Sequence, residues 1–300
     1  MIDKNIIKIL SENSELTTTE IAKKLNQKRN IIDYKIKKLY NNKIIKNQYI
    51  INFNSLNLEE YIIFLKINKF QEIKKDFFNL LKSNKNVRWF CETYPYYNIR
   101  ISILINKDEK KEIINEILEK LENNILDKEI IIVEDLIKPI NYGIYNFKKI
   151  NKKIIKDEIK LKIIEMITKN PDIKKYEISN ILNQSYESIR LKFKELYEEN
   201  VIYHKSISFD KKILNLNMTT QIIIKTNLNK DIENRFINFI TKNENIGRTR
   251  QLIGSYNFEI TIHSQNQEDL LSTINNLQNL LKERLISYQI IFNSLKLLTI

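Results

Sequence analysis

The chain has 300 residues and is strongly basic: 50 lysine and arginine residues against 37 aspartate and glutamate residues give a formal net charge of +13. This surplus indicates an acidic partner. Hydrophobic residues make up 42% of the chain, enough for folded cores in roughly two to four domains. Only three glycines occur, Gly143, Gly247 and Gly254, and their scatter excludes the glycine-rich phosphate loops of nucleotide-binding enzymes.

Cysteine and histidine are equally scarce. Cys91 has no second cysteine to form a disulfide, and His204 and His263 lie too far apart in sequence to indicate a zinc site. We therefore expect neither a metal site nor a cofactor. Residues 1–16 carry acidic side chains unlike a signal peptide, and no apolar stretch approaches the length of a membrane span. These features predict a cytoplasmic protein that does not associate with membranes.

The sequence contains an internal duplication. Residues 21–45 align without gaps with residues 178–202, and both segments contain the tripeptide Leu-Asn-Gln and the dipeptide Leu-Tyr at matching positions. Residues 87–103 align with residues 246–262 after a shift of two positions. The repeat therefore covers each half of the chain, and each half is one structural unit.

Each half should begin with helices. In the first half, Asp3 is placed to cap a helix that buries isoleucine and leucine residues, and Thr17 with Glu20 has the spacing of a capping box before a second helix. After a turn at Asn26 and Gln27, residues 29–41 show the periodicity of a third helix. This order predicts a helix-turn-helix whose third helix is the recognition helix.

The apolar residues of segment 43–53 predict a two-stranded wing that turns at Lys46 and Asn47. The pattern that follows is strand, helix, two strands that meet at residues 94–97, helix and strand. Two interleaved βαβ units of this kind form a ferredoxin-like sandwich, with both helices on one face of an antiparallel sheet. The second half repeats the order from Met218 to a strand near residues 286–292.

The predicted fold class is thus α+β, with two winged helix-turn-helix domains that alternate with two ferredoxin-like βαββαβ domains. The expected boundaries are 1–53 for the first winged helix, 54–138 for the first ferredoxin-like domain, 139–157 for a linker, 158–210 for the second winged helix and 211–300 for the second ferredoxin-like domain.

Three local marks carry a resemblance to a known family. They are Lys35-Ile36-Lys37-Lys38-Leu39 leading to Ile44-Ile45, its counterpart 192–196 leading to Val201-Ile202, and the turn Gly254-Ser255-Tyr256-Asn257. With this architecture the chain resembles the leucine-responsive and asparagine-synthesis regulators (Lrp/AsnC), in the tandem form of some archaeal members. Family members favour glycine just before the wing, where this chain has Lys43 and Asn200.

The resemblance implies a transcription regulator that binds double-stranded DNA. It also implies that the ferredoxin-like domains pair and sense an amino acid or another small effector. Because one chain holds two copies, we expect an intramolecular pseudo-dimer, from which higher homo-oligomers can assemble.

Positive charge favours the first winged helix as the stronger DNA contact. Residues 1–51 carry 11 basic and 5 acidic side chains, whereas residues 52–150 carry 16 and 15. In the second recognition helix Glu187 and Glu195 would repel phosphates. The DNA-contacting residues expected from the two helices are Lys28, Arg29, Asn30, Asp33, Tyr34, Lys37 and Lys38, then Ser185, Tyr186, Ser188, Arg190, Lys192 and Lys194.

The turn Gly254-Ser255-Tyr256-Asn257 is the expected effector site, although glycine and asparagine also suit a β-turn for conformational reasons alone. Two alternatives to a DNA-binding regulator stay open. One is an enzyme that resembles the siroheme decarboxylases, which share the architecture; Tyr97-Asn98 resembles a Tyr-Asn pair of that family, but residues 88–94 contain none of its histidines. The other is a sensing or interaction module without DNA binding. We expect no catalysis.

Overall fold

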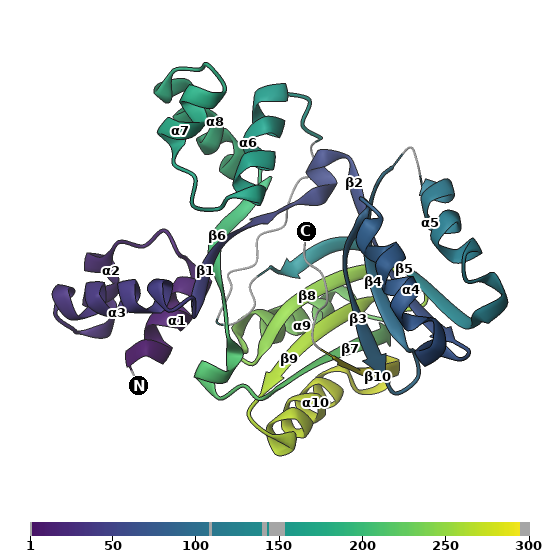
Figure 1. The fold of residues 1–300 in the computed structure, drawn as a ribbon. Coiled ribbons are helices and arrows are strands. Elements are labelled where there is room, and N and C mark those ends of the chain that lie inside the picture. Colours follow the sequence, from purple (N-terminus) through teal and green to yellow (C-terminus); the bar gives the residue numbers. More distant parts are fainter. Residues whose placement is uncertain (1, 108–109, 140–142, 144–153, 295–300) are drawn as a thin grey trace. The chain divides into compact units, whose positions relative to one another are not determined.

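The computed structural model describes residues 2–107, 110–139, 143 and 154–294 (Figure 1). The chain forms two compact units, and each unit combines segments of both repeats. The first unit consists of residues 1–56, 138–217 and 239–248, and the second of residues 57–137, 218–238 and 249–300. The first unit holds the helix-turn-helix domains of both repeats, and the second holds most of both ferredoxin-like domains.

In the first unit, each repeat contributes three helices and one strand. The first repeat gives α1 (Ile2–Glu12), α2 (Thr18–Leu25), α3 (Arg29–Asn41) and β1 (Ile45–Ile51), and the second gives α6 (Glu158–Lys169), α7 (Lys175–Ile181), α8 (Tyr186–Glu198) and β6 (Ile202–Phe209). The 3-10 turns η1 (Phe53–Leu56) and η3 (Lys211–Leu214) follow the strands. The predicted recognition helix at 29–41 is confirmed.

Local contacts explain where the first helices begin and end. The predicted capping box is confirmed: the Thr17 hydroxyl accepts a hydrogen bond from the Glu20 N–H, and the Glu20 carboxylate accepts one from the Thr17 N–H. Asn26 adopts a left-handed conformation that ends α2. The prediction that Asp3 caps α1 is wrong, because the helix already includes Ile2. Asp3 instead forms an ion pair with Lys35 at 2.7 Å, which joins α1 to α3.

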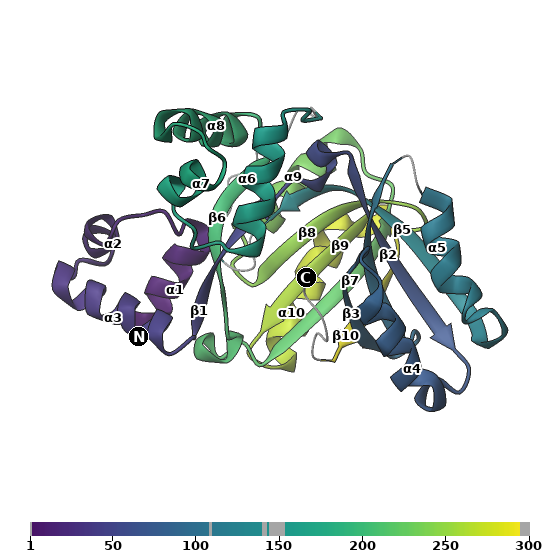
Figure 2. The same cartoon turned by 45° about the horizontal axis from the view of Figure 1, so that its top comes forward.

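The prediction of a hairpin wing at 43–53 is wrong. This segment forms the single strand β1, which runs antiparallel beside β6 of the second repeat, as Figures 1 and 2 both show. Lys46 and Asn47, the expected turn, lie within the strand opposite Ser208 and Ile207. The duplication supplies the partner strand from the other copy, so the chain needs no tight turn here.

The two helical cores are completed by the same strand exchange. Ile207 of the second repeat packs into the core that contains Ile21, Ile32 and other residues of the first repeat. Ile51 of the first repeat packs in return into the core of α6, α7 and α8. Because each core buries an isoleucine from the opposite copy, apolar burial stabilises the association of the two helix-turn-helix domains.

The second unit confirms the βαββαβ order in both repeats. The first repeat contributes β2 (Leu58–Ile67), α4 (Phe70–Ser83), β3 (Val87–Tyr94), β4 (Ile99–Asn106), α5 (Lys110–Glu119), η2 (Glu122–Asn124) and β5 (Ile125–Lys138). The second contributes β7 (Met218–Thr226), α9 (Lys230–Lys242), β8 (Ile246–Ile253), β9 (Phe258–Ser264), α10 (Gln267–Leu281), η4 (Lys282–Arg284) and β10 (Leu285–Asn293). The end of α9 and the start of β8, within residues 239–248, belong to the first unit.

The eight strands close into one barrel in the order β10-β3-β4-β2-β5-β8-β9-β7. Side chains alternate between its two faces. In β2, Ile63 and its odd-numbered neighbours pack on α4 and α5 outside the barrel, whereas Ile62 and Phe64 belong to a cluster that joins strands of both repeats. Closure removes the open sheet edges that two separate ferredoxin-like domains would expose.

The predicted domain boundaries stay a prediction, and most of the expected linker 139–157 lies outside the described residues. Its last residue, Asp157, is the N-cap of α6 and accepts hydrogen bonds from the Ile159 and Lys160 N–H groups. In the described part of the chain, none of the helices combines the length and apolar character needed to cross a bilayer.

Candidate nucleic-acid interface

The first recognition helix, α3, is anchored by Ile32 and Leu39, which are buried against α1 and α2. The opposite face is open to solvent. Tyr34 is 66% exposed, and Asp33 forms an ion pair with Lys37 at 2.7 Å, an i,i+4 contact along the helix. Of the residues predicted to contact DNA, Lys28, Arg29, Asn30, Tyr34, Lys37 and Lys38 are exposed, and Asp33 is half-buried.

The residues that leave the recognition helices adopt the conformation that glycine usually provides. Lys43 has a φ of +56° and Asn200 a φ of +54°. Both are left-handed, as the family's glycine at this position implies, although lysine adopts this region at a greater cost than asparagine. Each lies a few residues before the strand that crosses to the other repeat.

In the second recognition helix, α8, more of the basic side chains are paired with carboxylates of the same helix than in α3. Both guanidinium contacts of Arg190 go to Glu187, at 2.8 and 2.6 Å, and Lys194 lies 3.7 Å from Glu198. At the start of the helix, the Ser185 hydroxyl accepts a hydrogen bond from the N–H of the half-buried Ser188, which makes Ser185 the N-cap. Tyr186 is 53% exposed. Arg190 and Lys194 would have to exchange these carboxylates for phosphates on binding DNA.

Lys192 does not lie on the outward face where the sequence pattern predicted it. Its ammonium group binds the Asp157 carboxylate at 2.6 Å, and this contact raises the pKa of Lys192. Position 192 flanks the buried residues Ile189 and Phe193, so the helical period turns its side chain toward α6. Lys35 makes the corresponding contact with Asp3 in the first repeat.

The expected effector turn has a structural role in the sheet. The side-chain carbonyl of Asn257 accepts the Thr226 N–H at 2.7 Å, and the Asn257 N–H donates to the Ile224 carbonyl at 2.8 Å. Asn98 makes the same pair of contacts with Ile67 and Leu65 in the first repeat. These asparagines fix the turn between two strands of each sheet.

Gly254 is required by the backbone at this turn. Its φ is +144°, a backbone conformation that residues with a side chain rarely adopt. Tyr256 packs against the apolar cluster that joins the two repeats, and Ser255 is exposed. The geometry therefore gives Gly254, Tyr256 and Asn257 roles in folding, and effector binding here stays a prediction.

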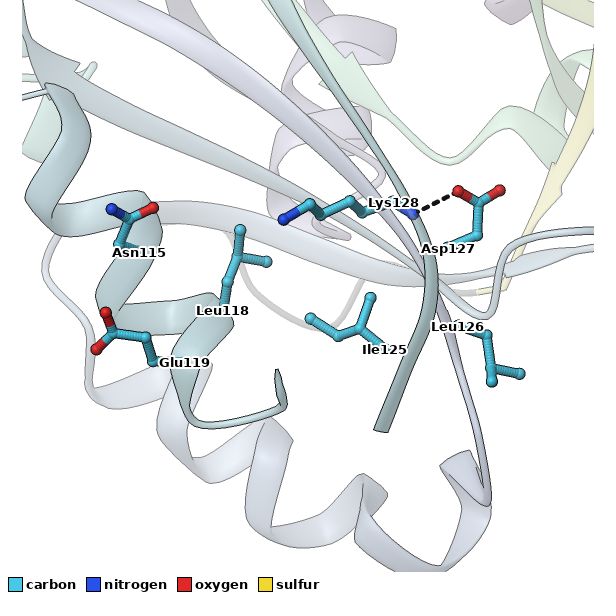
Figure 3. A pocket seen from close by; sticks show the side chains of 7 residues that line it. All are labelled: Asn115, Leu118, Glu119, Ile125, Leu126, Asp127 and Lys128. Atoms are coloured by element: carbon cyan, nitrogen blue, oxygen red, sulfur yellow. Dashed lines mark hydrogen bonds between the residues drawn. The ribbon is translucent and has the colours of Figure 1, made fainter. Parts of the chain in front are cut away.

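A separate pocket of about 570 Å³ opens between the end of α5 and the start of β5 (Figure 3). It is lined by Asn115, Leu118, Glu119, Ile125, Leu126, Asp127 and Lys128. Asp127 is already engaged, since one oxygen accepts the Lys128 N–H at 2.8 Å and the other the Tyr96 hydroxyl at 2.8 Å. We assign this pocket no ligand.

A buried charged cluster inside the barrel was not predicted from the sequence. Glu259 binds Arg100 and Arg250, the latter at 3.1 Å, and Glu60 binds Arg250 and Arg88, each at 3.3 Å. Burial alone would raise the pKa of Glu259, but the two guanidinium groups outweigh it and hold that pKa below its usual value. The guanidinium carbons of Arg100 and Arg250 lie 4.7 and 5.9 Å from the ring centroid of Trp89.

Two relatives of known sequence each match less than half of the chain. An uncharacterised HTH-type transcriptional regulator from Pyrococcus furiosus is 34% identical over 140 residues, which are 46% of this chain and 93% of the relative. The chain belongs to the Lrp/AsnC family of HTH-type transcriptional regulators. A second such regulator, from Pyrococcus abyssi, is 31% identical over 41% of this Lrp/AsnC-family chain and 84% of its own length. No family model matches the chain.

Among solved structures, that of a siroheme decarboxylase matches nearly the whole of this Lrp/AsnC-family protein. The siroheme decarboxylase NirDL has a TM-score of 0.65 over 99% of this chain and 92% of its own, with 14% sequence identity. At this identity the likeness shows the fold alone. It supports the arrangement of two helix-turn-helix domains and two ferredoxin-like domains in one molecule.

Proposed function

We propose that this protein is a sequence-specific DNA-binding transcription regulator. The observation that carries the proposal is the outer face of α3, where Arg29, Lys37 and Lys38 are exposed beside Asn30 and Tyr34. In a helix-turn-helix, basic side chains neutralise phosphates while amide and aromatic side chains reach base edges in the major groove. Membership of a family of transcription regulators supports the same function.

The electrostatic contribution is tested by four alanine substitutions in one variant, at Lys28, Arg29, Lys37 and Lys38. Removing one phosphate contact should reduce the slope of log affinity against log salt by about 0.9. A matched control replaces four exposed lysines of the other unit, Lys75, Lys82, Lys85 and Lys225. We expect a shallower slope for the α3 variant and an unchanged slope for the control. Equal slopes for the α3 variant and the unsubstituted protein would contradict the proposal.

We also propose the intramolecular pseudo-dimer as the minimal functional unit. Its support is the pairing of β1 with β6 and the closure of one barrel by strands of both repeats. Light scattering should therefore detect a stable species with the mass of one chain, or multiples built from it.

Amino-acid sensing near Gly254–Asn257 is part of the same proposal, and isothermal titration with amino acids tests it.

A siroheme decarboxylase is the second candidate, and the fold shared with NirDL is what favours it. Strand β3, however, contains no histidine, and Trp89 of this strand lies against the buried arginines. A visible absorption titration with siroheme separates the two candidates. The regulator proposal predicts that the spectrum of siroheme does not change when the protein is added.

A further inference from the structure

We infer that the DNA site of this protein is not a palindrome but two unlike half-sites, each read by one recognition helix. This inference rests on the proposed DNA-binding function. A symmetric dimer presents two identical helices and therefore selects inverted repeats. Here β1 and β6 pair antiparallel, with Ile45 opposite Phe209 and Ile51 opposite Ile202, so that corresponding strand ends lie at opposite ends of the ladder. The backbone thus has the approximate two-fold relation of a dimer.

The two helices keep the same buried residues. Ile32 and Leu39 of α3 correspond to Ile189 and Leu196 of α8, and all four are buried. Lys35 and Lys192 correspond as well, and each is held in an ion pair with an aspartate of its own repeat. Both repeats have therefore retained the buried residues and the ion pair that hold the recognition helix against its own domain.

The outward faces, in contrast, have diverged at almost every position. The first helix presents Arg29, Asn30, Asp33 and Tyr34 where the second presents Tyr186, Glu187, Arg190 and Leu191. An asparagine that can pair with adenine is replaced by a glutamate that can accept from cytosine. Only Lys37 and Lys194 remain alike among the exposed positions of the central turns.

The charges have diverged in the same way. Residues 29–41 carry four basic and one acidic side chain, whereas residues 186–198 carry three of each. Arg190 is further neutralised by its two contacts with Glu187. The first half-site should consequently supply most of the phosphate affinity, and the second should add discrimination by base contacts and by the repulsion of its glutamates.

The test is selection of bound duplexes from a random pool by the full-length chain. We expect an enriched motif with two dissimilar halves. A palindromic motif would overturn the inference while leaving the proposed function intact. Binding without sequence preference would overturn the sequence specificity of the proposed function and the inference with it. Absence of any binding would instead overturn the proposed function and this inference with it.

A second experiment transfers the exposed residues of α3 to α8 and predicts how the selected motif changes. The variant Tyr186→Arg, Glu187→Asn, Arg190→Asp and Leu191→Tyr gives α8 the face of α3. All four side chains are exposed, the net charge is unchanged, and the new aspartate lies four residues before Lys194, as Asp33 lies before Lys37. We expect this variant to select an inverted repeat of the first half-site. Lys169→Ala, at an exposed site on α6, is the control and should retain the original motif. An unchanged motif in the transplant variant would also overturn the inference.

Discussion

Arg100 and Glu259 occupy equivalent positions of the two repeats and bind each other inside the barrel. Each lies two residues after the asparagine that fixes its turn, Asn98 or Asn257, and their side chains are only 2% and 3% exposed. Two copies of the first repeat in the same arrangement would bring arginine against arginine, and two copies of the second would bring glutamate against glutamate. The duplicated chain has therefore diverged so that its halves complement each other.

Glu259→Gln should destabilise the protein strongly, because it leaves Arg100 without a charged partner in a buried site. Loss of one partner of a buried ion pair costs about 3–5 kcal/mol. Urea unfolding of the full chain measures this change. Glu198→Gln is the matched control, since its pair with Lys194 is exposed and contributes no more than about 1 kcal/mol. Equal effects of the two substitutions would show that the buried pair does not hold the repeats together.

Asn257→Ala tests whether the turn is structural. The substitution leaves the Thr226 N–H without the acceptor that the side chain provides, which costs about 1–3 kcal/mol. Thermal and urea unfolding should show this loss, and Ser255→Ala, in the exposed part of the same turn, should leave stability unchanged. A stable Asn257→Ala variant with altered amino-acid binding would instead support a purely ligand-binding role.

His204 should make stability depend on pH in the acidic range. Burial, with a smaller effect of Arg248, lowers the pKa of His204 to about 4, whereas an unfolded histidine titrates near 6.5. Between these values the unfolded chain takes up a proton that the folded chain does not, so stability falls as the pH falls from about 6.5 to 4. The loss approaches about 3 kcal/mol. His204→Gln should remove this part of the dependence, and parallel pH profiles for both proteins would contradict the assignment.

The duplication and the order of helices and strands along the chain could be predicted from the sequence, because they depend on local periodicity and on direct self-comparison. Prediction failed where a segment takes its partner from the other repeat. The apolar pattern of residues 43–53 shows that strand structure is favoured, but it does not say which strand pairs with it. The interior position of Arg100 and Glu259 was hidden for the same reason, since a charged residue between apolar neighbours on a strand usually faces solvent.

In the candidate interface, the position of one lysine could not be predicted for the same reason. The outward residues of α3 follow from helical periodicity, and the structure leaves six of the seven exposed. Lys192 was expected to face outward because an isolated lysine favours solvent. Its partner Asp157 lies 35 residues earlier, in the segment predicted as a linker, and this long-range contact was not visible in the pattern.

The substitution Lys192→Ala tests whether Lys192 stabilises the fold or contacts DNA. The substitution removes the ion pair that joins α8 to the N-cap of α6, and we expect a loss of about 1 kcal/mol in unfolding free energy, since the side chain is partly exposed. The salt dependence of DNA binding should stay unchanged. Lys37→Ala should behave in the opposite way, with a shallower salt slope and nearly unchanged stability, because Lys37 is 71% exposed. A reduced slope for Lys192→Ala would return this lysine to the DNA-contacting set and would mean that its contact with Asp157 opens on binding.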